Sequence, residues 1–424
     1  MKVLVIGSGG REHALVWKLA QSPRVSRLFC APGNAGIESL AQCVPIPADD
    51  IAGLKSFVLS ERVDLTVVGP EGPLALGIAD EFRKAKLRIF GPVRAAAQIE
   101  SSKAFAKDMM VRNHIPTAAA RSFDELKPAR DYIDRQGVPL VVKADGLAQG
   151  KGVVIATSRE QAHQAAAAML EERVFGQAGR RVLIEEFLAG EEVTVMAFTD
   201  GKTVRPMLPS QDHKRIGDGD TGANTGGMGA YAPASIATAS LLQTVTQQVL
   251  RPIVDALSRL GSPFQGVLYA GLMIVEERPY VLEFNARFGD PETQVVLPLL
   301  QTDLVDVLEA VVEHRLDQID VAWHTDTAVC VVLTSRGYPE PCVTGKPIAG
   351  LGDIQPSRDM MVFHAGTKRQ GTDVVTAGGR VLGVTGIGPN LSLARDLAYQ
   401  TVRRISYDGC HFRSDIARRG LVEK

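Results

Sequence analysis

Two side chains with oxygen atoms and an arginine alternate along one short stretch, in a pattern suited to a metal ion beside a phosphate. Residues 280–292 contain Glu283, Asn285 and Arg287. Side chains two apart on a strand share a face, so Glu283 and Asn285 point the same way, with Arg287 next in line. Two such oxygen ligands suit Mg²⁺, which completes its coordination sphere with water and substrate phosphates. Arg287 would then stabilise a transferring phosphoryl group or hold a carboxylate.

The side chains that alternate with these three residues are apolar. They form an apolar set: Phe284, Ala286 and Phe288. Such alternation is typical of a strand with one face on a core and the other toward a site. It argues against the alternative, a solvated edge strand.

A segment rich in glycine lies between two predicted strands and is suited to binding a polyphosphate. Residues 143–153 include two lysines and three glycines: Lys143, Gly146, Gly150, Lys151 and Gly152. Successive backbone N–H groups in such a turn can point at an anion, and a lysine neutralises it. A Walker A loop would open a helix, whereas here a strand follows. We therefore predict a flap that closes over a triphosphate, with a glycine-rich hairpin and two solvated lysines as the alternative.

Residues 210–229 are polar and rich in glycine, with Asp-His-Lys-Arg at 212–215 and Asn-Thr-Gly-Gly-Met-Gly at 224–229. A structureless loop of about 20 residues within a compact domain is uncommon unless it binds a ligand. We expect such a loop here, binding a small zwitterion or a phosphate. A disordered surface excursion fits the pattern equally well.

The first predicted strand, residues 2–6, is followed by Gly-Ser-Gly-Gly at 7–10. The third glycine of a dinucleotide fingerprint is missing, and no acidic residue ends the second strand. A glycine turn before a helix N-terminus still favours a phosphate. Residues 32–36 and 69–73 end two further strands, so all three loops should meet at the carboxyl edge of one sheet. We expect them to bind a sugar phosphate of mononucleotide size rather than NAD.

The elements that position these residues follow two patterns. Strand and helix alternate up to about residue 100, which predicts a doubly wound, Rossmann-like parallel sheet. An α+β unit is then expected as an insertion in a larger one, and a small α+β unit follows. The units are expected at residues 1–102, at 103–121 together with 188–325, at 122–187, and at 326–424. Single helices are predicted at residues 74–86 and 239–260, and a hairpin is predicted from strands 268–275 and 280–284.

Composition excludes several classes of partner. The 424 residues carry a formal net charge of −1, so no overall field attracts nucleic acid or an anionic membrane. The five cysteines are scattered and lack metal-site spacing, which favours free thiols in a reducing compartment. The N-terminus runs directly into a strand without a signal peptide, and no apolar run approaches the ~18 residues of a spanning helix. We therefore expect a cytoplasmic protein with small-molecule partners, either a monomer or a dimer.

Together these segments resemble the ATP-grasp superfamily, in which two α+β units hold ATP between them. More narrowly, the chain resembles the phosphoribosylamine–glycine ligase (glycinamide ribonucleotide synthetase) family over essentially its whole length. The stretch Arg-Phe-Gly-Asp-Pro-Glu at 287–292 matches that family's own signature. The other matching stretches are residues 7–15, 32–36, 143–153, 212–215 and 224–229.

The resemblance implies a reaction driven by ATP with Mg²⁺ or Mn²⁺. Glycine and 5-phosphoribosylamine would give glycinamide ribonucleotide, ADP and phosphate through a glycyl phosphate, in purine biosynthesis. A carboxylate is a poor electrophile and phosphorylation activates it, so the protein's task would be positioning and charge stabilisation. It also implies ATP-grasp central and small lid domains, preceded by the Rossmann-like domain and followed by a C-terminal one.

Matching motifs also assign roles to individual residues. Catalytic side chains would be Arg287, Asp290 and Lys214. ATP would contact the flap, the hinge and the ribose-binding position: Lys103, Lys143, Gly146, Gly150, Lys151, Gly152, Glu185, Glu186, Phe187, Leu188 and Glu192. The other substrates would contact the N-terminal loops and the polar loop: Gly9, Gly10, Arg11, Glu12, Gly33, Asn34, Pro70, Glu71, Asp212, Asn224, Gly226 and Gly227. The metal ligands would be Glu283 and Asn285.

Three other functions stay open from the sequence. Another ATP-grasp ligase of the purine pathway would carboxylate or formylate its substrate, and the stretch at 287–292 argues against it. A dehydrogenase would use the N-terminal sheet for NAD, and the incomplete fingerprint argues against that. A non-catalytic regulator would bind ATP but release no ADP with any acceptor.

Overall fold

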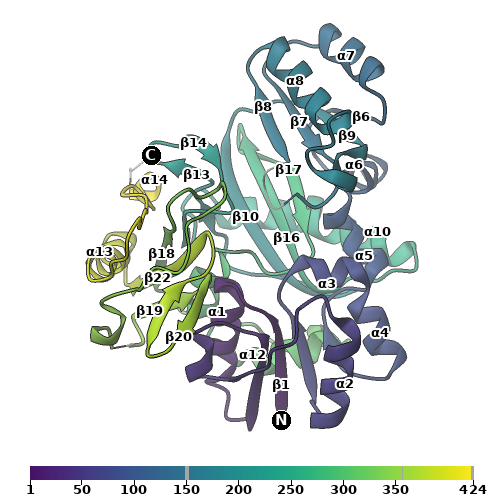
Figure 1. The fold of residues 1–424 in the computed structure, drawn as a ribbon. Helices are drawn as coiled ribbons and strands as arrows, with labels where there is room; N and C mark the ends of the chain where they lie inside the picture. Colours follow the sequence, from purple (N-terminus) through teal and green to yellow (C-terminus); the bar gives the residue numbers. More distant parts are fainter. Residues whose placement is uncertain (149–151, 356, 422–424) are drawn as a thin grey trace.

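The computed structural model describes residues 1–148, 152–355 and 357–421. An N-terminal unit, a lid formed by residues 120–186 and a C-terminal unit surround a central antiparallel sheet (Figure 1). In the described part, no helix is both long enough and apolar enough to cross a membrane.

The N-terminal unit is a parallel sheet with strand order β3-β2-β1-β4-β5. Its strands are β1 (Lys2–Gly7), β2 (Arg27–Pro32), β3 (Gln42–Cys43), β4 (Leu65–Val68) and β5 (Ile89–Phe90). Its helices are α1 (Gly10–Leu19), α2 (Ile51–Glu61), α3 (Glu71–Leu76), α4 (Ile78–Lys84) and α5 (Arg94–Ser101). Within β1, Leu4 and Ile6 pack in one buried cluster while Val3 and Val5 pack in another. Both faces of the strand are therefore covered, which confirms the predicted doubly wound sheet.

The single helix predicted at residues 74–86 is wrong, because two helices, α3 and α4, occupy this region. The break lies at Gly77, whose φ of +91° is left-handed. Glycine adopts this conformation without steric cost, so the chain can change direction there. Glu71 is the first residue of α3, directly after the N-cap Pro70, and α3 ends at the Gly77 turn.

The lid is an antiparallel sheet of order β6-β9-β7-β8. Its elements are β6 (Ala120–Phe123), α7 (Leu126–Arg135), β7 (Leu140–Ala144), β8 (Val153–Ala156), α8 (Arg159–Leu170) and β9 (Val182–Glu186). Side chains such as Ala129, Ile133, Val142 and Ile184 form a buried cluster confined to this unit. The lid thus has its own core, as expected for an inserted α+β unit.

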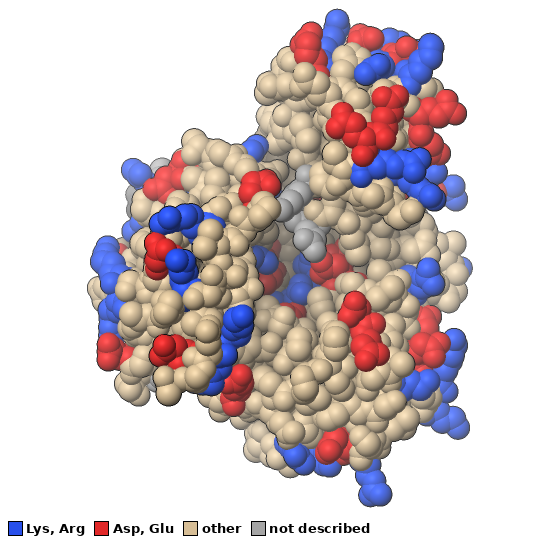
Figure 2. Space-filling view, viewed as in Figure 1, with Lys and Arg blue, Asp and Glu red and all other residues tan. Residues whose placement is uncertain are grey.

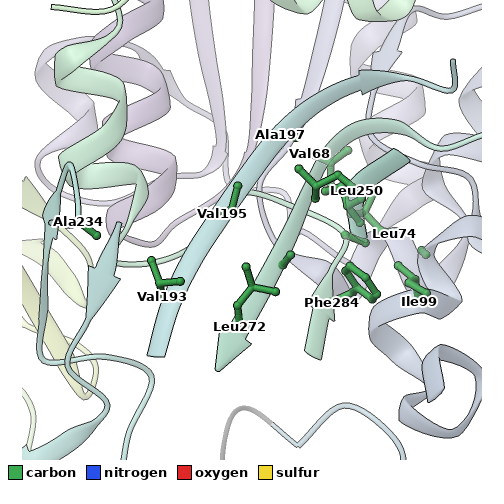
Figure 3. Close-up of a cluster of buried hydrophobic side chains, with 14 of the residues drawn as sticks. Val68, Leu74, Ile99, Val193, Val195, Ala197, Ala234, Leu250, Leu272 and Phe284 are labelled. Atoms are coloured by element: carbon green, nitrogen blue, oxygen red, sulfur yellow. The ribbon is translucent and has the colours of Figure 1, made fainter. Parts of the chain in front are cut away.

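The central sheet has the order β11-β10-β16-β17 and is antiparallel. Its strands are β10 (Glu191–Asp200), β11 (Val204–Pro206), β16 (Gln265–Val275) and β17 (Arg278–Asn285). The predicted hairpin is thereby confirmed. Val193, Val195, Leu272 and Phe284 belong to one buried cluster of this sheet, with Phe284 beside Ile99 of α5 (Figure 3). Burial of a large apolar side chain contributes roughly 1.5–3 kcal/mol, so the buried Val281 and Phe284 anchor β17 beneath its polar residues.

Helices flank the central sheet: α6 (Lys103–Arg112), α9 (Ala239–Val245), α10 (Arg251–Arg259), α11 (Thr293–Val296) and α12 (Leu304–Val312). A π-helical turn at Thr246–Leu250 joins α9 to α10. The helical run predicted at 239–260 is therefore confirmed, with this turn inside it.

The C-terminal unit is built on a sheet of order β12-β15-β18-β22-β19. Its strands are β12 (Gln211–Asp212), β15 (Gly229–Ala232), β18 (Thr327–Thr334), β19 (Met360–His364) and β22 (Arg380–Gly388). The remaining elements are β20 (Thr367–Gln370), β21 (Asp373–Thr376), α13 (Leu391–Val402) and α14 (Arg418–Leu421). Since β12 and β15 pair into this sheet, the polar segment at 210–229 is tied to the C-terminal unit. The unit limits given from sequence stay predictions.

The structureless loop predicted at 210–229 is wrong. Besides β12, the segment contains a two-stranded ribbon of β13 (Arg215–Gly217) and β14 (Thr221–Asn224). Gly219 and Asp220 form its turn with φ values of +66° and +58°. Glycine and aspartate tolerate this left-handed conformation, so the polar composition encodes a tight turn rather than a disordered loop.

Candidate functional site

One face of the molecule is hollowed where the lid, the central unit and the C-terminal unit meet (Figure 2). Acidic and basic side chains are visible inside the hollow. Contacts among the predicted site residues cross the same boundaries. Lys143 of the lid reaches β17, and Arg287 reaches two glutamates of the N-terminal unit. The predicted residues therefore come together from distant parts of the chain.

Glu185 on β9 holds two lysines with one buried carboxylate. Its Oε2 lies 2.6 Å from Lys143 Nζ on β7, and its Oε1 lies 2.9 Å from Lys107 Nζ on α6. Lys143 also donates to the carbonyl of Leu282 on β17 at 3.1 Å. Burial raises the pKa of Glu185, but the two lysines outweigh burial and hold the pKa below its usual value. The Lys143 ammonium is thus fixed between the lid and the central sheet.

Sequence reasoning missed Lys107, although a signal was present. Lys103 and Lys107 are four residues apart on α6, so they share one face of the helix. Lys103 Nζ donates to the carbonyl of Gly146, at the start of the predicted flap, at 3.1 Å. Burial lowers the pKa of Lys103, and Glu283 is the strongest influence in the opposite direction. Lys103 therefore faces both the flap and the predicted metal ligand.

Glu283 and Asn285 lie at the end of β17, as predicted. Burial raises the pKa of Glu283, but nearby lysines, Lys214 foremost, lower it below its usual value. An ionised carboxylate and an amide oxygen are hard donors that suit Mg²⁺ or Mn²⁺. Within residues 1–148, 152–355 and 357–421, no three His, Cys, Asp or Glu side chains form a metal site by themselves. An ion held here would take its other ligands from water and substrate.

Arg287 follows β17 and is already engaged by acidic side chains. Its Nε lies 3.1 Å from Glu71 Oε2, and its Nη2 lies 3.0 Å from Glu100 Oε1. Burial raises the pKa of Glu71, but Arg287 and then Arg11 lower it to about 2. Burial also raises the pKa of Glu100. Glu100 was not among the site residues predicted from the sequence. A substrate phosphoryl group or carboxylate would have to share the donors of Arg287 with these two glutamates.

Asp290 is held by a residue that sequence reasoning also missed. Arg380 Nη2, from β22, lies 3.3 Å from Asp290 Oδ2, and Arg380 Nη1 donates to the Asp290 carbonyl at 2.7 Å. The same Nη1 donates to the carbonyl of Gly226, whose N–H donates to Tyr338 Oη at 2.9 Å. Gln294 donates to Asp290 Oδ1 at 2.7 Å. The C-terminal unit thereby fixes two predicted site residues, and nothing in an ordinary strand sequence marks Arg380 for this role.

The start of α1 is occupied by the chain's own carboxylate. Gly9 N donates to Glu12 Oε2 at 2.6 Å, and Arg11 Nε lies 2.6 Å from Glu12 Oε1. Arg11 Nη1 also donates to the carbonyl of Phe288 at 3.1 Å. A phosphate at Gly9 and Gly10 would have to compete with Glu12, whereas a hydroxyl or an amine could donate to it. Gly10 lies close to Asp290, since a Cβ added at Gly10 would be 3.7 Å from Asp290 Oδ1.

Asn34 and Gly33 shape the second loop. The Asn34 amide donates to the carbonyls of Ser8 and His364 at 2.8 and 2.9 Å. Gly33 has φ +77°, and a Cβ there would lie 2.4 Å from Cys43 Sγ, so only glycine fits. Asn34 and Gly33, both predicted to contact substrate, therefore stabilise the conformation of this loop.

Lys214 and Asp212 lie in a strongly acidic environment. Lys214 Nζ is 2.7 Å from Glu192 Oε2, the residue predicted to bind ribose hydroxyls. Burial raises the pKa of Asp212 to about 7, while Lys214 opposes this shift. Glu292, another nearby carboxylate, accepts from Tyr269 Oη at 2.9 Å. The sequence placed Glu292 in the signature stretch, but Tyr269 was missed because it lies within an apolar strand.

The hinge and flap are described only in part. Phe187 is 38% exposed, which leaves an apolar ring available beside the lid, and Leu188 is half-buried. Glu186 Oε1 accepts from the backbone N–H of Ala119 at 2.8 Å. Gly150 and Lys151 lie outside the described residues.

The remaining predicted residues have backbone tasks. The Gly152 carbonyl accepts from the backbone N–H of Ala144 at 2.8 Å, and Pro70 is the N-cap residue of α3. Asn224 pairs with Arg215 in the ribbon. Gly227 has φ +112°, and its N–H donates to Thr225 Oγ1 at 2.9 Å.

Comparison with protein families gives matches along nearly the whole chain. The N domain of phosphoribosylglycinamide synthetase matches residues 1–100, its ATP-grasp (A) domain matches residues 101–293, and its C domain matches residues 328–419. Together the three matches cover far more than half of the chain.

Individual proteins are similar over the same length. A phosphoribosylamine–glycine ligase from Allochromatium vinosum is 51% identical, over 100% of both chains. One from Vibrio parahaemolyticus is 49% identical, over 100% of this chain and 99% of its own. The crystal structure of the Thermotoga maritima phosphoribosylamine–glycine ligase has a TM-score of 0.85 at 32% identity, covering 98% of this chain and 100% of its own.

Proposed function

Because the chain belongs to the phosphoribosylglycinamide synthetase family, we propose that the residues gathered at the hollow carry out that family's reaction. The protein is an ATP-dependent carbon–nitrogen ligase of purine biosynthesis. It joins glycine to 5-phosphoribosylamine and gives glycinamide ribonucleotide, ADP and phosphate. It has the multidomain ATP-grasp fold and uses ATP with a divalent metal ion.

We place the ATP triphosphate between the lid and the central sheet, against Lys143 and Lys103. Support comes from Glu185, which fixes Lys143, and from the contact of Lys103 with the flap. The adenine would lie against residues 186–188, where Phe187 offers an exposed ring. Glu192 would accept from the ribose hydroxyls, with Lys214 beside it to balance the charge.

Glu283 and Asn285 would hold Mg²⁺ or Mn²⁺, since their oxygen donors fit either ion. When bound, such an ion neutralises the charge that develops on the phosphate oxygens during transfer. The chain's own contribution is to keep the half-buried Glu283 ionised. Three lysines do this by lowering its pKa: Lys214, Lys143 and Lys103.

We propose that glycine is activated as an acyl phosphate. A carboxylate oxygen of glycine attacks the γ-phosphorus of ATP, and the bond from that phosphorus to ADP breaks. Arg287 and Lys214 would stabilise the charge of this transfer, since both are cations held at the site, Arg287 by Glu71 and Glu100 and Lys214 by Glu192. The amine of phosphoribosylamine then attacks the activated carbonyl carbon and loses a proton. Phosphate leaves with the glycine oxygen.

The other substrate, phosphoribosylamine, would lie at the N-terminal loops. Asp290 adjoins Gly10 there and is held by Arg380, and Glu12 and Glu71 present further carboxylates. Carboxylates accept hydrogen bonds from amines and hydroxyls, so these groups would orient the sugar amine toward the acyl phosphate.

A cytoplasmic location also belongs to this proposal. The five cysteines are free thiols, which suits a reducing compartment, and ATP and glycine are available there. The expected partners are the small-molecule substrates.

The observation that carries the site assignment is the contact between the lid and β17, where Lys143 Nζ donates to the carbonyl of Leu282, next to Glu283, at 3.1 Å. The proposed ligase reaction is tested by measuring ADP release with ATP, Mg²⁺ and glycine, with and without phosphoribosylamine generated in the same tube. ADP should form only when every substrate is present. If ATP binds but no ADP forms in the complete mixture, the proposal fails.

A further inference from the structure

Residues 411–419, which we call the C-terminal clamp, contact the β13–β14 ribbon at its turn. Figure 1 shows this ribbon beside α14, near the C-terminal end of the chain. Ser414 N donates to Asp218 Oδ1 at 2.8 Å, and Gly219 N donates to an Asp415 carboxylate oxygen at 2.8 Å. The ribbon turn is therefore attached to a distant part of the sequence rather than being free in solvent.

Arg413 lies at the centre of the clamp and is only 1% exposed. Its Nε and Nη2 donate to the two carboxylate oxygens of Asp415, each at 2.7 Å. Its Nη1 donates to Asp220 Oδ1 at 2.9 Å and to the carbonyl of Arg215 at 3.1 Å. This planar, forked pattern is specific to a guanidinium, and a lysine ammonium cannot reproduce it.

The clamp contacts the residues on both sides of Lys214. Arg413 binds the carbonyl of Arg215, and Ala417 N donates to His213 Nε2 at 3.3 Å. His213 can accept this bond because burial lowers the pKa of its imidazole to about 3, which keeps it neutral. The backbone that carries Lys214 is therefore fixed at both of its neighbours.

A third contact immobilises Lys214 from within the ribbon. The Lys214 carbonyl accepts from Thr225 N and from Thr225 Oγ1, both at 2.8 Å. Its side chain then extends to Glu192, where Nζ and Oε2 are 2.7 Å apart. Lys214 thus stands on a segment whose position is set by the C-terminal unit, while its ammonium lies in the central unit.

We propose that Arg413 is a positioning residue for the ligase, which sets the place of the Lys214 ammonium at the ATP site through the carbonyl of Arg215. Arg413 contacts no substrate in this scheme, and its effect passes entirely through Lys214. The inference rests on the proposed function in one respect, the assignment of Lys214 and Glu192 to the ATP site. A displacement of about 1 Å in a positioned group can lower the reaction rate up to about 10²-fold. A small shift of the ribbon would therefore be enough to impair the enzyme.

The test measures the Kd of ATP with Mg²⁺ by isothermal titration calorimetry, which requires no turnover. Arg413→Lys keeps the charge and loses the forked contacts. Asp220→Asn weakens the contact with Arg413 from the ribbon side, at a residue whose side chain is 43% exposed and therefore tolerant of change. Asp220 also pairs with Arg419 of the clamp at 2.7 Å, so this variant loosens both contacts between the clamp and the ribbon turn. The matched control is Arg336→Lys, because Arg336 pairs with Asp408 at 2.9 Å on the surface of the same unit.

Both clamp variants should raise the Kd of ATP about tenfold, about the size of one lost hydrogen bond to a charged group. The control should stay within about twofold of the unchanged protein. The decisive comparison is made in the Lys214→Met variant. If Arg413 acts through Lys214, adding Arg413→Lys to that variant should change the Kd of ATP less than about twofold. Should Arg413→Lys not fold, Asp220→Asn in both backgrounds gives the same comparison.

Two results would overturn the proposal. One is a lower melting temperature for the clamp variants with an unchanged Kd for ATP, which would make the clamp a structural support only. The other is an equal loss of affinity with and without Lys214. Failure of the ligase assignment gives a different outcome, since the unchanged protein would then bind ATP and release no ADP with glycine and phosphoribosylamine.

Discussion

Replacing Glu185 by glutamine removes one negative charge from between two lysines while keeping the shape of the side chain. The carboxylate is 2.6 Å from Lys143 Nζ and 2.9 Å from Lys107 Nζ, and the three side chains are 3%, 8% and 8% exposed. A neutral amide offers one acceptor oxygen and an NH₂ group. It can satisfy one ammonium, and it presents a donor to the other.

The expected cost follows from this geometry. Removing one partner of a buried ion pair costs about 3–5 kcal/mol, because the remaining charge stays buried without compensation. Lys107 keeps Thr117 Oγ1 as an acceptor at 2.7 Å, and Lys143 keeps the Leu282 carbonyl at 3.1 Å. These acceptors relieve part of the loss, so we expect the lower end, about 3 kcal/mol, in the free energy of opening the lid strands.

Hydrogen exchange of the β7 and β9 amides measures this opening free energy directly, even though a chain of several units need not unfold in one step. Glu186→Gln is the matched control. Glu186 is the exposed neighbour, and glutamine keeps the acceptor for Ala119 N, so the change should stay below about 0.5 kcal/mol. The phosphates of ATP would return negative charge to Lys143, so added ATP should restore part of the loss in Glu185→Gln. A loss no larger than that of the control would refute the argument that Glu185 holds both lysines.

Three further predictions concern the metal site and acid stability. Glu283→Gln should lower turnover on the order of 10²-fold, because a metal clamp supplies several kcal/mol to the transition state; turnover within about threefold would rule the assignment out. EDTA should abolish ADP release, and Mg²⁺ or Mn²⁺ should restore it; release that persists in the chelator contradicts a metal-dependent reaction. Burial lowers the pKa of His13 from 6.5 to about 3 and that of His364 from 6.5 to about 4. Below pH 6.5 the unfolded chain therefore binds more protons than the folded chain. The contribution of each neutral histidine to the free energy of unfolding should be full above about pH 6.5 and should fall toward pH 4. At pH 5 the loss should be about 2 kcal/mol per histidine. Urea unfolding at pH 7 and pH 5 checks this slope. The slope should be shallower in His13→Gln than in the unchanged protein, because His364 and the buried His213 still contribute to it. An equal slope in His13→Gln would contradict the contribution of His13.

The parts of the site that follow local rules could be predicted from the sequence. The two-residue period placed Glu283 and Asn285 on one strand and Phe284 in the core, and the structure confirms that strand and that burial. The alternation of strands and helices likewise predicted the parallel N-terminal sheet, since a strand covered on both faces is a continuous apolar run, as residues 3–6 of β1 are.

Partners supplied by distant segments could not be predicted. Arg380 meets Asp290, and Glu100 meets Arg287, across large separations in sequence, and neither stands in a recognisable motif. Lys107 was the exception, because its four-residue spacing from Lys103 was visible but was not used.

Local competition among hydrogen bonds explains the other differences. The glycine turn at 7–10 indicated an open anion site, but the Glu12 carboxylate accepts the Gly9 N–H. The polar segment at 210–229 indicated a loop, but backbone pairing and the C-terminal clamp order it. In both places the composition was interpreted correctly as polar, while the partner of each polar group depended on the fold.

The central claim, that glycine is activated as an acyl phosphate before the amine attacks, is tested most directly with glycine labelled by ¹⁸O in its carboxylate. The complete reaction should transfer one labelled oxygen to each inorganic phosphate released, because the carboxylate oxygen becomes the bridge to phosphorus and leaves with it. Unlabelled phosphate alongside labelled amide would contradict the mechanism, since ATP would then be hydrolysed without passing through glycine.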